Sequence, residues 1–254
     1  MRTSLLTTTT CLTTVVLLAG ATAWADFTLV SPPPRNEASI TQIFESFYSP
    51  GTTWQATGTR LDSNGASVDL TNGNLLATRV DDSGFPGILD AAAPYFGSAE
   101  DQRWSGQEFS FDAVARYAGY TQQFGYDLLG SNTGYTKLFD ITGSGMNVSG
   151  SGTLTLQPGQ SVAWRRTGGD GGMYSSNVVH NADGYDHMIA YRITGYNDDL
   201  ARWMLFWEDK PAGGDKDYND LAVQVSTRCV PEPGMGVTIF LVCGAYWVLR
   251  RRDW

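Results

Sequence analysis

Residues 203–225 read Trp203-Met-Leu-Phe-Trp207-Glu208-Asp209-Lys-Pro-Ala-Gly213-Gly214-Asp215-Lys-Asp217-Tyr218-Asn219-Asp220-Leu221-Ala-Val-Gln-Val225. Two apolar runs, 203–207 and 221–225, flank an acidic loop that contains proline and glycine. Short apolar runs of this kind are typical of β-strands, and Gly and Pro interrupt regular structure between them. The stretch therefore predicts two strands joined by a loop in which oxygen-bearing side chains are concentrated.

Similar strand signals occur along most of the chain. Short strand-like runs lie at 52–61, 66–70, 75–80, 137–141, 153–156, 161–165, 187–193, 203–207 and 221–226. Apolar side chains also alternate with polar ones at Phe109 and Phe111 and at Phe124, Tyr126 and Leu128. The pattern predicts an all-β fold, an antiparallel β-sandwich of jelly-roll type.

Two stretches are less regular. Residues 40–48 fit either a strand or a short helix, and residues 81–106, rich in Gly and Pro, predict a linker or an edge loop. The part of the chain between the two ends is therefore divided into an N-terminal β-rich region, 26–106, and a β-sandwich domain with the acidic loop, 107–229.

The acidic loop is a candidate calcium site. Its proposed ligands are Glu208, Asp209, Asp215, Asp217, Asn219 and Asp220. Carboxylates at this density repel one another unless a cation compensates, and Ca²⁺ takes six to eight oxygen ligands in flexible geometry. The start of the pattern, Asp215-x-Asp217-x-Asn219, imitates an EF-hand loop, but the sixth position is Asp220 rather than Gly and the twelfth is Ser226 rather than Glu. The alternative is an ordinary polar hairpin whose Asp and Asn side chains cap turns.

A second polar cluster, 181–187, precedes the strand signal at 187–193 and includes Asp183, Asp186 and His187. It is positioned to approach the acidic loop from the end of an adjacent strand. Zinc is not expected here, because the chain has only two histidines, His180 and His187, without the spacing of a ligand pair.

The N-terminal segment has the features of a secretory signal peptide. Arg2 precedes an uncharged run, 5–23, which ends in the small-x-small pattern of Ala23 and Ala25. A positive start, an apolar stretch and such a site predict a signal helix that signal peptidase removes after residue 25. The alternative is an N-terminal anchor that stays uncleaved.

The C-terminal segment, 230–254, ends in an apolar run and a basic cluster. Pro231, Glu232 and Pro233 precede the uncharged residues 234–249, and the positions that follow are Arg250, Arg251 and Arg252. Sixteen helical residues span about 24 Å, against about 30 Å for the hydrocarbon core of a bilayer. A short transmembrane helix with its arginines on the cytoplasmic side is predicted. A permanent anchor and a buried core helix are the alternatives.

In this order of Pro-Glu-Pro, short apolar helix and arginines, the tail resembles the PEP-CTERM sorting signal, also catalogued as an ice-binding-protein C-terminal domain. The resemblance implies a Gram-negative bacterium that makes extracellular polysaccharide, and a membrane peptidase, exosortase, that removes the tail. It implies an intermediate tethered to the inner membrane by this tail alone, and a final place on the outer surface or in the extracellular matrix.

Three further stretches carry a second resemblance: Asp183-Gly-Tyr-Asp186-His187-Met-Ile-Ala-Tyr191, Phe206-Trp-Glu208-Asp209 and Gly213-Gly214-Asp215-Lys-Asp217-Tyr218-Asn219-Asp220. Together, from about residue 109 to 226, the chain resembles a bacterial surface domain of unknown function catalogued as forty-one fourteen. The resemblance implies a β-sandwich and a surface role, and no known reaction.

Composition excludes some functions. The formal net charge is −9, so the basic surface expected of a nucleic-acid-binding protein is missing. Cys229 is the one cysteine between the predicted signal peptide and the predicted tail, so an internal disulfide of the mature part is not expected.

No catalytic motif of the G-x-S-x-G, H-E-x-x-H or phosphate-loop type occurs in the sequence. The chain is therefore interpreted as a structural or adhesion component associated with exopolysaccharide, and not as an enzyme. The alternative is a carbohydrate-binding module, with Trp54, Trp104, Trp164 and Trp207 as candidates for stacking on sugars. A glycoside-active enzyme is a weaker alternative, since carboxylates are plentiful.

Overall fold

The computed structural model describes residues 30–48, 68–70, 75–80, 101–106, 108–131, 134–168 and 172–228. The predicted signal peptide with Ala23 and Ala25 lies outside these residues. So do the strand expected at 52–61 and the predicted sorting tail with its Pro231, Glu232, Pro233, Arg250, Arg251 and Arg252. Among the described residues, no helix is both long and apolar enough to cross a membrane.

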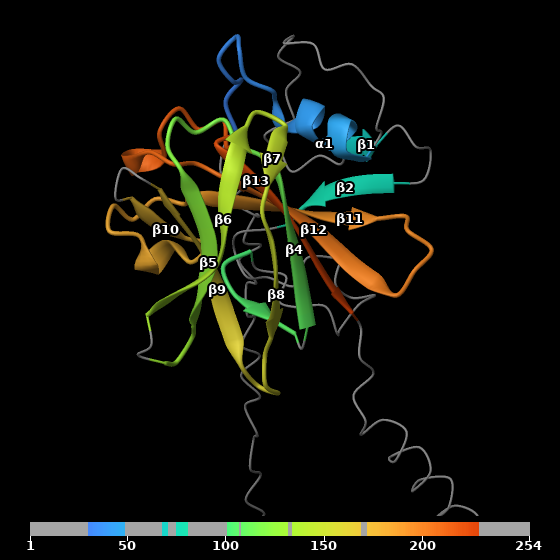
Figure 1. The fold of residues 1–254 in the computed structure, drawn as a ribbon, viewed down its shortest axis with the longest axis vertical. Coiled ribbons are helices and arrows are strands. Elements are labelled where there is room, and N and C mark those ends of the chain that lie inside the picture. Colours follow the sequence, from blue (N-terminus) through green and yellow to red (C-terminus); the bar gives the residue numbers. More distant parts are fainter. Residues whose placement is uncertain are drawn as a thin grey trace, which may run out of the picture.

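Two antiparallel sheets form the molecule (Figure 1). The larger sheet has seven strands, in the order β1 (Val68–Leu70), β2 (Leu75–Arg79), β11 (Met188–Thr194), β12 (Leu200–Trp207), β13 (Leu221–Arg228), β4 (Glu108–Ala115) and β8 (Ser151–Thr155). The smaller sheet has the order β10 (Met173–Ser175), β9 (Ser161–Gly168), β5 (Gln122–Leu128), β6 (Tyr135–Ser144) and β7 (Asn147–Ser149), with β3 (Trp104–Ser105) paired to β9. The prediction of an all-β antiparallel sandwich is confirmed, and the jelly-roll likeness stays a prediction.

The main core lies between the two sheets. Phe109 and Phe111 of β4 pack with Phe124 of β5 and with Trp164 of β9, with ring centroids 5.0–6.0 Å apart for the contacts between the strands. Trp203 and other side chains of β12 belong to the same apolar cluster. Burial of these large side chains is the main stabilising contribution that holds the two sheets together.

The larger sheet is covered on both faces at β12. Trp203, Leu205 and Trp207 face the core between the sheets, whereas Met204 and Phe206 face a second apolar cluster. Successive side chains of a strand point to opposite faces, so a strand buried on both sides has a continuous apolar sequence rather than an alternating one. This explains the unbroken apolar run at 203–207.

The second cluster is closed by helix α1 (Ile40–Tyr48). Residues 40–48, for which a strand and a helix were both open, are therefore helical. Ser39 and Gln42 form reciprocal bonds at the start: the Ser39 amide donates to Oε1 of Gln42 (2.7 Å), and the Gln42 amide donates to Oγ of Ser39 (3.3 Å). This capping pattern begins the helix, and fully buried Ile43 and Phe44 attach it to the sheet.

Strands on either side of residue 106 pair with one another. β2 pairs with β11, and β3 pairs with β9. Residues before 107 therefore contribute to both sheets, and the predicted division at 106 into two regions stays a prediction. Two short 3-10 helices, η1 (Val178–His180) and η2 (Pro211–Gly213), lie in loops.

Candidate metal centre

The acidic loop, residues 208–220, connects two neighbouring strands of the larger sheet. Trp207 at the end of β12 pairs directly with Leu221 at the start of β13. The ladder thus holds both ends of the loop side by side, and the acidic residues between them must gather at one end of the sheet. The two strands predicted at 203–207 and 221–226 are confirmed.

The backbone of the loop is unusually constrained. Ala212, Lys216 and Tyr218 have φ angles of 60°, 62° and 56°, a region that residues with a side chain adopt rarely and at a cost. Gly214 also has a positive φ, and a Cβ atom there would lie 2.1 Å from Oε1 of Glu208. The loop is therefore folded tightly against the carboxylate of Glu208.

Glu208 is the centre of this arrangement. Its side chain is fully buried. Oε1 accepts from the amides of Asp209 (3.1 Å) and Lys210 (3.2 Å), and Oε2 accepts from the amide of Lys216 (3.0 Å). Burial, followed by the negative charge of Asp220, raises the pKa of Glu208 to about 9.

Asp209 and Asp220 lie at the neck of the loop, the place where its two ends come together, and both are buried. Oδ2 of Asp220 accepts from the amide of Asp209 at 2.9 Å, while Oδ2 of Asp209 accepts from Nε2 of Gln122 at 3.3 Å. Burial and then the charge of Asp220 raise the pKa of Asp209 to about 7, against an opposing effect of Arg166. In a protein without a bound cation, these carboxyl groups therefore retain protons near neutral pH.

Asp217 and Asn219 each carry a buried oxygen that is not satisfied. Asp217 is 2% exposed and Asn219 is 0% exposed. Oδ2 of Asp217 and Oδ1 of Asn219 have no hydrogen-bond partner within the described part of the chain. Burial raises the pKa of Asp217 to about 7. Buried acceptors without donors are costly, and here they lie within a cluster of carboxylates.

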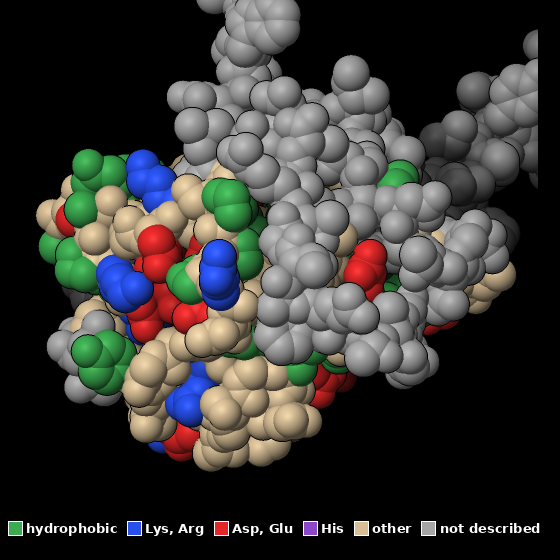
Figure 2. Space-filling view, turned by 90° about the horizontal axis from the view of Figure 1, so that it is seen from above, with side chains coloured by type: hydrophobic (Ala, Val, Ile, Leu, Met, Phe, Trp, Pro, Cys, Tyr) green, Lys and Arg blue, Asp and Glu red, His purple; other side chains and the backbone are tan. Residues whose placement is uncertain are grey.

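Five of the six predicted ligands converge in two groups that share Glu208. Carboxylate oxygens of Glu208, Asp215 and Asp217 lie within 4.8 Å of one another, and so do those of Glu208, Asp209 and Asp220. Oxygens that bind one Ca²⁺ at 2.3–2.6 Å lie at most about 5 Å apart, so both groups fit such an ion. Asp215 is exposed and pairs with Nζ of Lys210 at 3.4 Å. Figure 2 shows acidic side chains gathered between basic ones on this side of the molecule.

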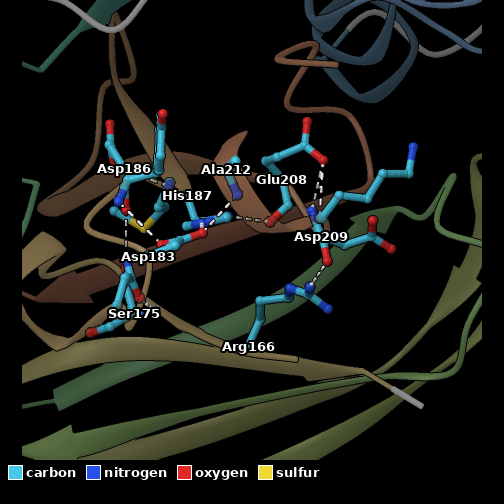
Figure 3. Close-up of polar contacts among 12 residues, drawn as sticks. Arg166, Ser175, Asp183, Asp186, His187, Glu208, Asp209 and Ala212 are labelled. Atoms are coloured by element: carbon cyan, nitrogen blue, oxygen red, sulfur yellow. Dashed lines mark hydrogen bonds and ion pairs between the residues drawn. The ribbon is translucent and has the colours of Figure 1, made fainter. Parts of the chain in front are cut away.

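The second polar cluster contacts the loop, as its sequence position suggested. Nε2 of His187 lies 2.9 Å from Oδ2 of Asp183, and the amide of Ala212 donates to the same oxygen at 2.8 Å (Figure 3). Nδ1 of His187 lies 3.2 Å from the carbonyl oxygen of Glu208. Both ring nitrogens are thus engaged by protein oxygens, and the cluster positions the loop.

One buried cation, Arg166 of β9, joins the loop to the smaller sheet. Nη2 donates to the carbonyl oxygen of Asp209 (2.6 Å) and Nη1 to Oε1 of Gln122 (2.8 Å). The guanidinium also lies 4.8 Å from the ring centroid of Tyr174, which stacks on His187 at 3.7 Å. Sequence reasoning missed Gln122, Arg166 and Tyr174, because nothing in their local patterns distinguishes them from other strand residues.

Comparison with protein families gives one match. Residues 150–228 match the model of a family described as "Domain of unknown function (DUF4114)". This confirms the resemblance seen in residues 183–220, although the match begins at residue 150 rather than 109. The likeness of the tail to PEP-CTERM stays a prediction. No curated protein matches the chain.

Among solved structures, two lectins share limited similarity with the chain. One is a Chromobacterium violaceum lectin in complex with alpha-methyl-fucoside, with 18% identity and a TM-score of 0.33 over 47% of this chain and 87% of that one. The other is a Ralstonia solanacearum high-affinity mannose-binding lectin, with 20% identity and a TM-score of 0.32 over the same shares. At these scores the backbones differ too much for the lectins' sugars to indicate a ligand here.

Proposed function

We propose that this chain, whose residues 150–228 match the DUF4114 family, is an exported surface or matrix protein whose β-sandwich is stabilised by one Ca²⁺. Its role is structural or adhesive, in association with exopolysaccharide. The observation that carries the calcium site is the pair of buried, unsatisfied oxygens of Asp217 and Asn219 beside converging carboxylates.

The chemistry of the loop suits a hard divalent cation. Every proposed ligand is an oxygen from Glu208, Asp209, Asp215, Asp217, Asn219 or Asp220, which is the donor set that Ca²⁺ prefers. Bound calcium would displace the protons that raised pKa values otherwise retain on Glu208, Asp209 and Asp217. It would also convert the repulsion among these carboxylates into attraction.

The position of the loop explains why such an ion would stabilise the whole domain. The loop joins β12 to β13, and Arg166 ties the carbonyl of Asp209 to the other sheet. A ligand that binds only the folded state stabilises it by about 2.7 kcal/mol at a hundredfold excess over Kd. The ion would therefore stabilise the contact between the two sheets as well as the hairpin.

Export and sorting belong to the same proposal. Signal peptidase is expected to cut after Ala25, and exosortase is expected to remove the tail beyond Pro231, Glu232 and Pro233. Two features of the sequence support this: the small-x-small site and the Pro-Glu-Pro, apolar helix and arginine order. N-terminal sequencing and intact-mass analysis of protein from the native host test both cuts, and a retained tail would contradict the sorting proposal.

Thermal unfolding tests the calcium site directly. The melting temperature should be higher in millimolar calcium than in chelator, and Asp217→Ala should abolish this difference. Asp112→Ala is the matched control, because Asp112 is an exposed residue of β4 and should leave the calcium effect intact. Identical melting curves of the unaltered protein in calcium and in chelator would show that the loop is a turn and not a metal site.

A second candidate function, carbohydrate binding, has one observation in its favour. A pocket of about 370 Å³ includes the side chains of Asp127, Arg165 and His180, polar groups that suit a hydroxylated ligand. Of the candidate tryptophans, Trp104, Trp164 and Trp207 are buried in the core and are not exposed for stacking on a sugar, and Trp54 lies outside the described residues. Binding of the host polysaccharide that is lost in Asp127→Asn, without turnover, would support this candidate.

A further inference from the structure

The outer face of the larger sheet is covered only in part by α1. Met204 and Phe206 of β12 point to this face and belong to the apolar cluster beneath the helix. Farther along the same face the side chains are polar, with Arg202 on β12 and Gln224 and Ser226 on β13. Exposed polar residues of β4 and β8 continue the surface: Glu108, Ser110, Asp112, Ser151, Thr153 and Thr155. The larger sheet therefore carries an open polar surface beside the helix.

Strand register arranges this polar surface in rows that cross the sheet. The first row consists of directly paired residues on four strands, Thr153, Ser110, Ser226 and Arg202. The second row consists of Ser151, Asp112 and Gln224. Neighbouring strands lie about 4.8 Å apart, so the first row is about 14 Å long. Hydroxyl, carboxylate, amide and guanidinium groups thus follow one another along a flat, accessible path.

At the end of the first row, Arg202 stacks on Tyr196, which lies in the turn between β11 and β12. The guanidinium carbon is 3.9 Å from the centroid of the ring. Asp198 fixes the guanidinium by accepting from Nη1 at 2.8 Å and from Nη2 at 2.6 Å. Tyr196 nevertheless stays 38% exposed. An exposed aromatic ring is therefore held in one orientation before any ligand binds, which lowers the entropic cost of binding.

The second row ends at the same group of rings. Oε1 of Gln224 accepts from the hydroxyl of Tyr48 at 2.9 Å. The ring centroid of Tyr48 is 6.4 Å from that of Tyr196 and 4.9 Å from that of Phe47. Phe47, near the end of α1, is 37% exposed. Two exposed rings, Phe47 and Tyr196, therefore border the polar surface where both of its rows end.

This combination of groups suits a sugar chain. The C–H face of a sugar ring packs on an aromatic ring, and its hydroxyl groups donate to and accept from side chains such as Ser, Thr and Asp. Carboxylates outnumber cations among the described residues of the surface and its adjoining turn: Glu108, Asp112, Asp198 and Asp199 against Arg202 and Arg228. Because like charges repel, the surface favours a neutral polysaccharide over an acidic one.

We propose that the polar surface of β8, β4, β13 and β12 binds a neutral polysaccharide chain, with a sugar ring packed on the exposed part of Tyr196. This inference rests on the association with exopolysaccharide in the proposed function. It assigns the contact to the larger sheet, whereas the pocket at Asp127 lies on the smaller one. A second copy of the chain is the competing occupant, but it would bring the same excess of carboxylates to the contact.

Calorimetric titration of the exported protein, in calcium, with the neutral and acidic fractions of the host exopolysaccharide tests the proposal. The neutral fraction should bind. Tyr196→Ala should raise its Kd about tenfold, as expected for the loss of one ring contact, whereas Tyr196→Phe keeps the ring and should bind like the unaltered protein. Tyr120→Ala is the matched control, because Tyr120 is 50% exposed in the connection between β4 and β5 and should leave Kd unchanged.

Ser110→Leu tests the polar rows without changing an aromatic ring. It fills the middle of the first row with a side chain that forms no hydrogen bonds, so Kd should rise again. The replaced side chains are exposed, so each variant should melt like the unaltered protein, and this excludes misfolding as the cause.

The outcomes separate this inference from the proposed function. If the neutral fraction binds but either Tyr196→Ala or Ser110→Leu binds it as tightly as Tyr120→Ala does, the inference is overturned and the association with exopolysaccharide stands. The same holds if only the acidic fraction binds. If neither fraction binds, the association itself fails and the inference fails with it, while the effect of calcium on the melting temperature still decides the metal site.

Discussion

The backbone amide of Asp209 donates a hydrogen bond to Oδ2 of Asp220, 2.9 Å away, and thereby closes the neck of the acidic loop. The bond joins the second residue of the loop to its last residue, directly above the paired ends of β12 and β13. It also brings two carboxyl groups together at a buried position, where burial and mutual charge raise the pKa of Asp209. The closure that shapes the loop therefore also makes it electrostatically unfavourable without a cation.

This relationship predicts how the stability of the metal-free protein depends on pH. The folded-state pKa values of Glu208, Asp209 and Asp217, about 9, about 7 and about 7, lie above the value of about 4 for unfolded carboxyl groups. Between pH 4 and these values the folded state binds more protons than the unfolded state, so the free energy of unfolding falls as pH rises. In chelator, the melting temperature should fall by several degrees from pH 5 to pH 9.

Calcium should cancel this fall, because a bound cation replaces the protons as the compensating charge. The measurement is thermal unfolding at four or five pH values, in calcium and in chelator. A melting temperature in chelator that rises across this window would show that these carboxyl groups are not protonated in the folded protein.

Gly214 should tolerate no side chain. In Gly214→Ala the new Cβ would lie 2.1 Å from Oε1 of Glu208, at a φ of 46°, so either the loop or the buried carboxylate must move. We expect a loss of about 2–4 kcal/mol in the free energy of unfolding together with loss of calcium binding. Gly159→Ala is the control, since Gly159 also has a positive φ, 83°, but has nothing within 4 Å of the new atom.

The control should cost only about 1 kcal/mol, the ordinary penalty of a positive φ, and should leave calcium binding unchanged. Denaturant unfolding and calcium titration measure both effects. Equal effects of the two substitutions would mean that the packing of Glu208 against Gly214 does not matter.

Arg166 should matter for stability far more than a surface arginine. Arg166→Met removes the donors to Gln122 and to the carbonyl of Asp209 and leaves buried acceptors unpaired. We expect a loss of about 3 kcal/mol in chelator. Arg202→Met, which breaks an ion pair with exposed Asp198, should cost clearly less, because solvent screens the charge of Asp198 and no buried acceptor is left unpaired. Denaturant unfolding decides, and a loss below 1 kcal/mol for Arg166→Met would contradict the role assigned to it.

The strands and the acidic loop were predictable from sequence because their signals are local. The apolar runs at 203–207 and 221–226 predict strands by their composition alone, and the carboxylates of the loop lie close together in the sequence. Arg166 and Gln122 reach Asp209 across 43 and 87 positions of the chain. Such contacts depend on the order of strands in the sheets, and the hydrophobic periodicity of a single segment does not predict that order.

Helix α1 is a second element whose structure could not be predicted from a local sequence pattern. Its residues fit a strand or a helix by pattern alone, and the bonds between Ser39 and Gln42 support the helix only once Phe44 has a sheet to pack on. Helix propensity alone does not stabilise so short a helix in water, and packing against the rest of the protein supplies most of its stability. The contacts of the preceding residues with the acidic loop, such as the hydrogen bond from the amide of Ser31 to the carbonyl oxygen of Lys216, also depend on tertiary packing and could not be predicted from local patterns.

Asp183 should be required for tight calcium binding although it is not a proposed ligand. Its Oδ2 accepts from the amide of Ala212 (2.8 Å) and lies 2.9 Å from Nε2 of fully buried His187, so it holds the part of the loop whose backbone is most constrained. Asp183→Ala frees Ala212 from this bond, and the loop must then be ordered at the moment of binding, at a cost in conformational entropy. We expect calcium affinity to fall about tenfold and the free energy of unfolding in chelator to fall by about 1–3 kcal/mol. Calorimetric titration and denaturant unfolding give the two values, with Asp112→Ala as an exposed control. If Asp183→Ala lowers stability but binds calcium as tightly as the control does, then the loop is preorganised by Glu208 and its own amides, and the 181–187 cluster serves only the fold.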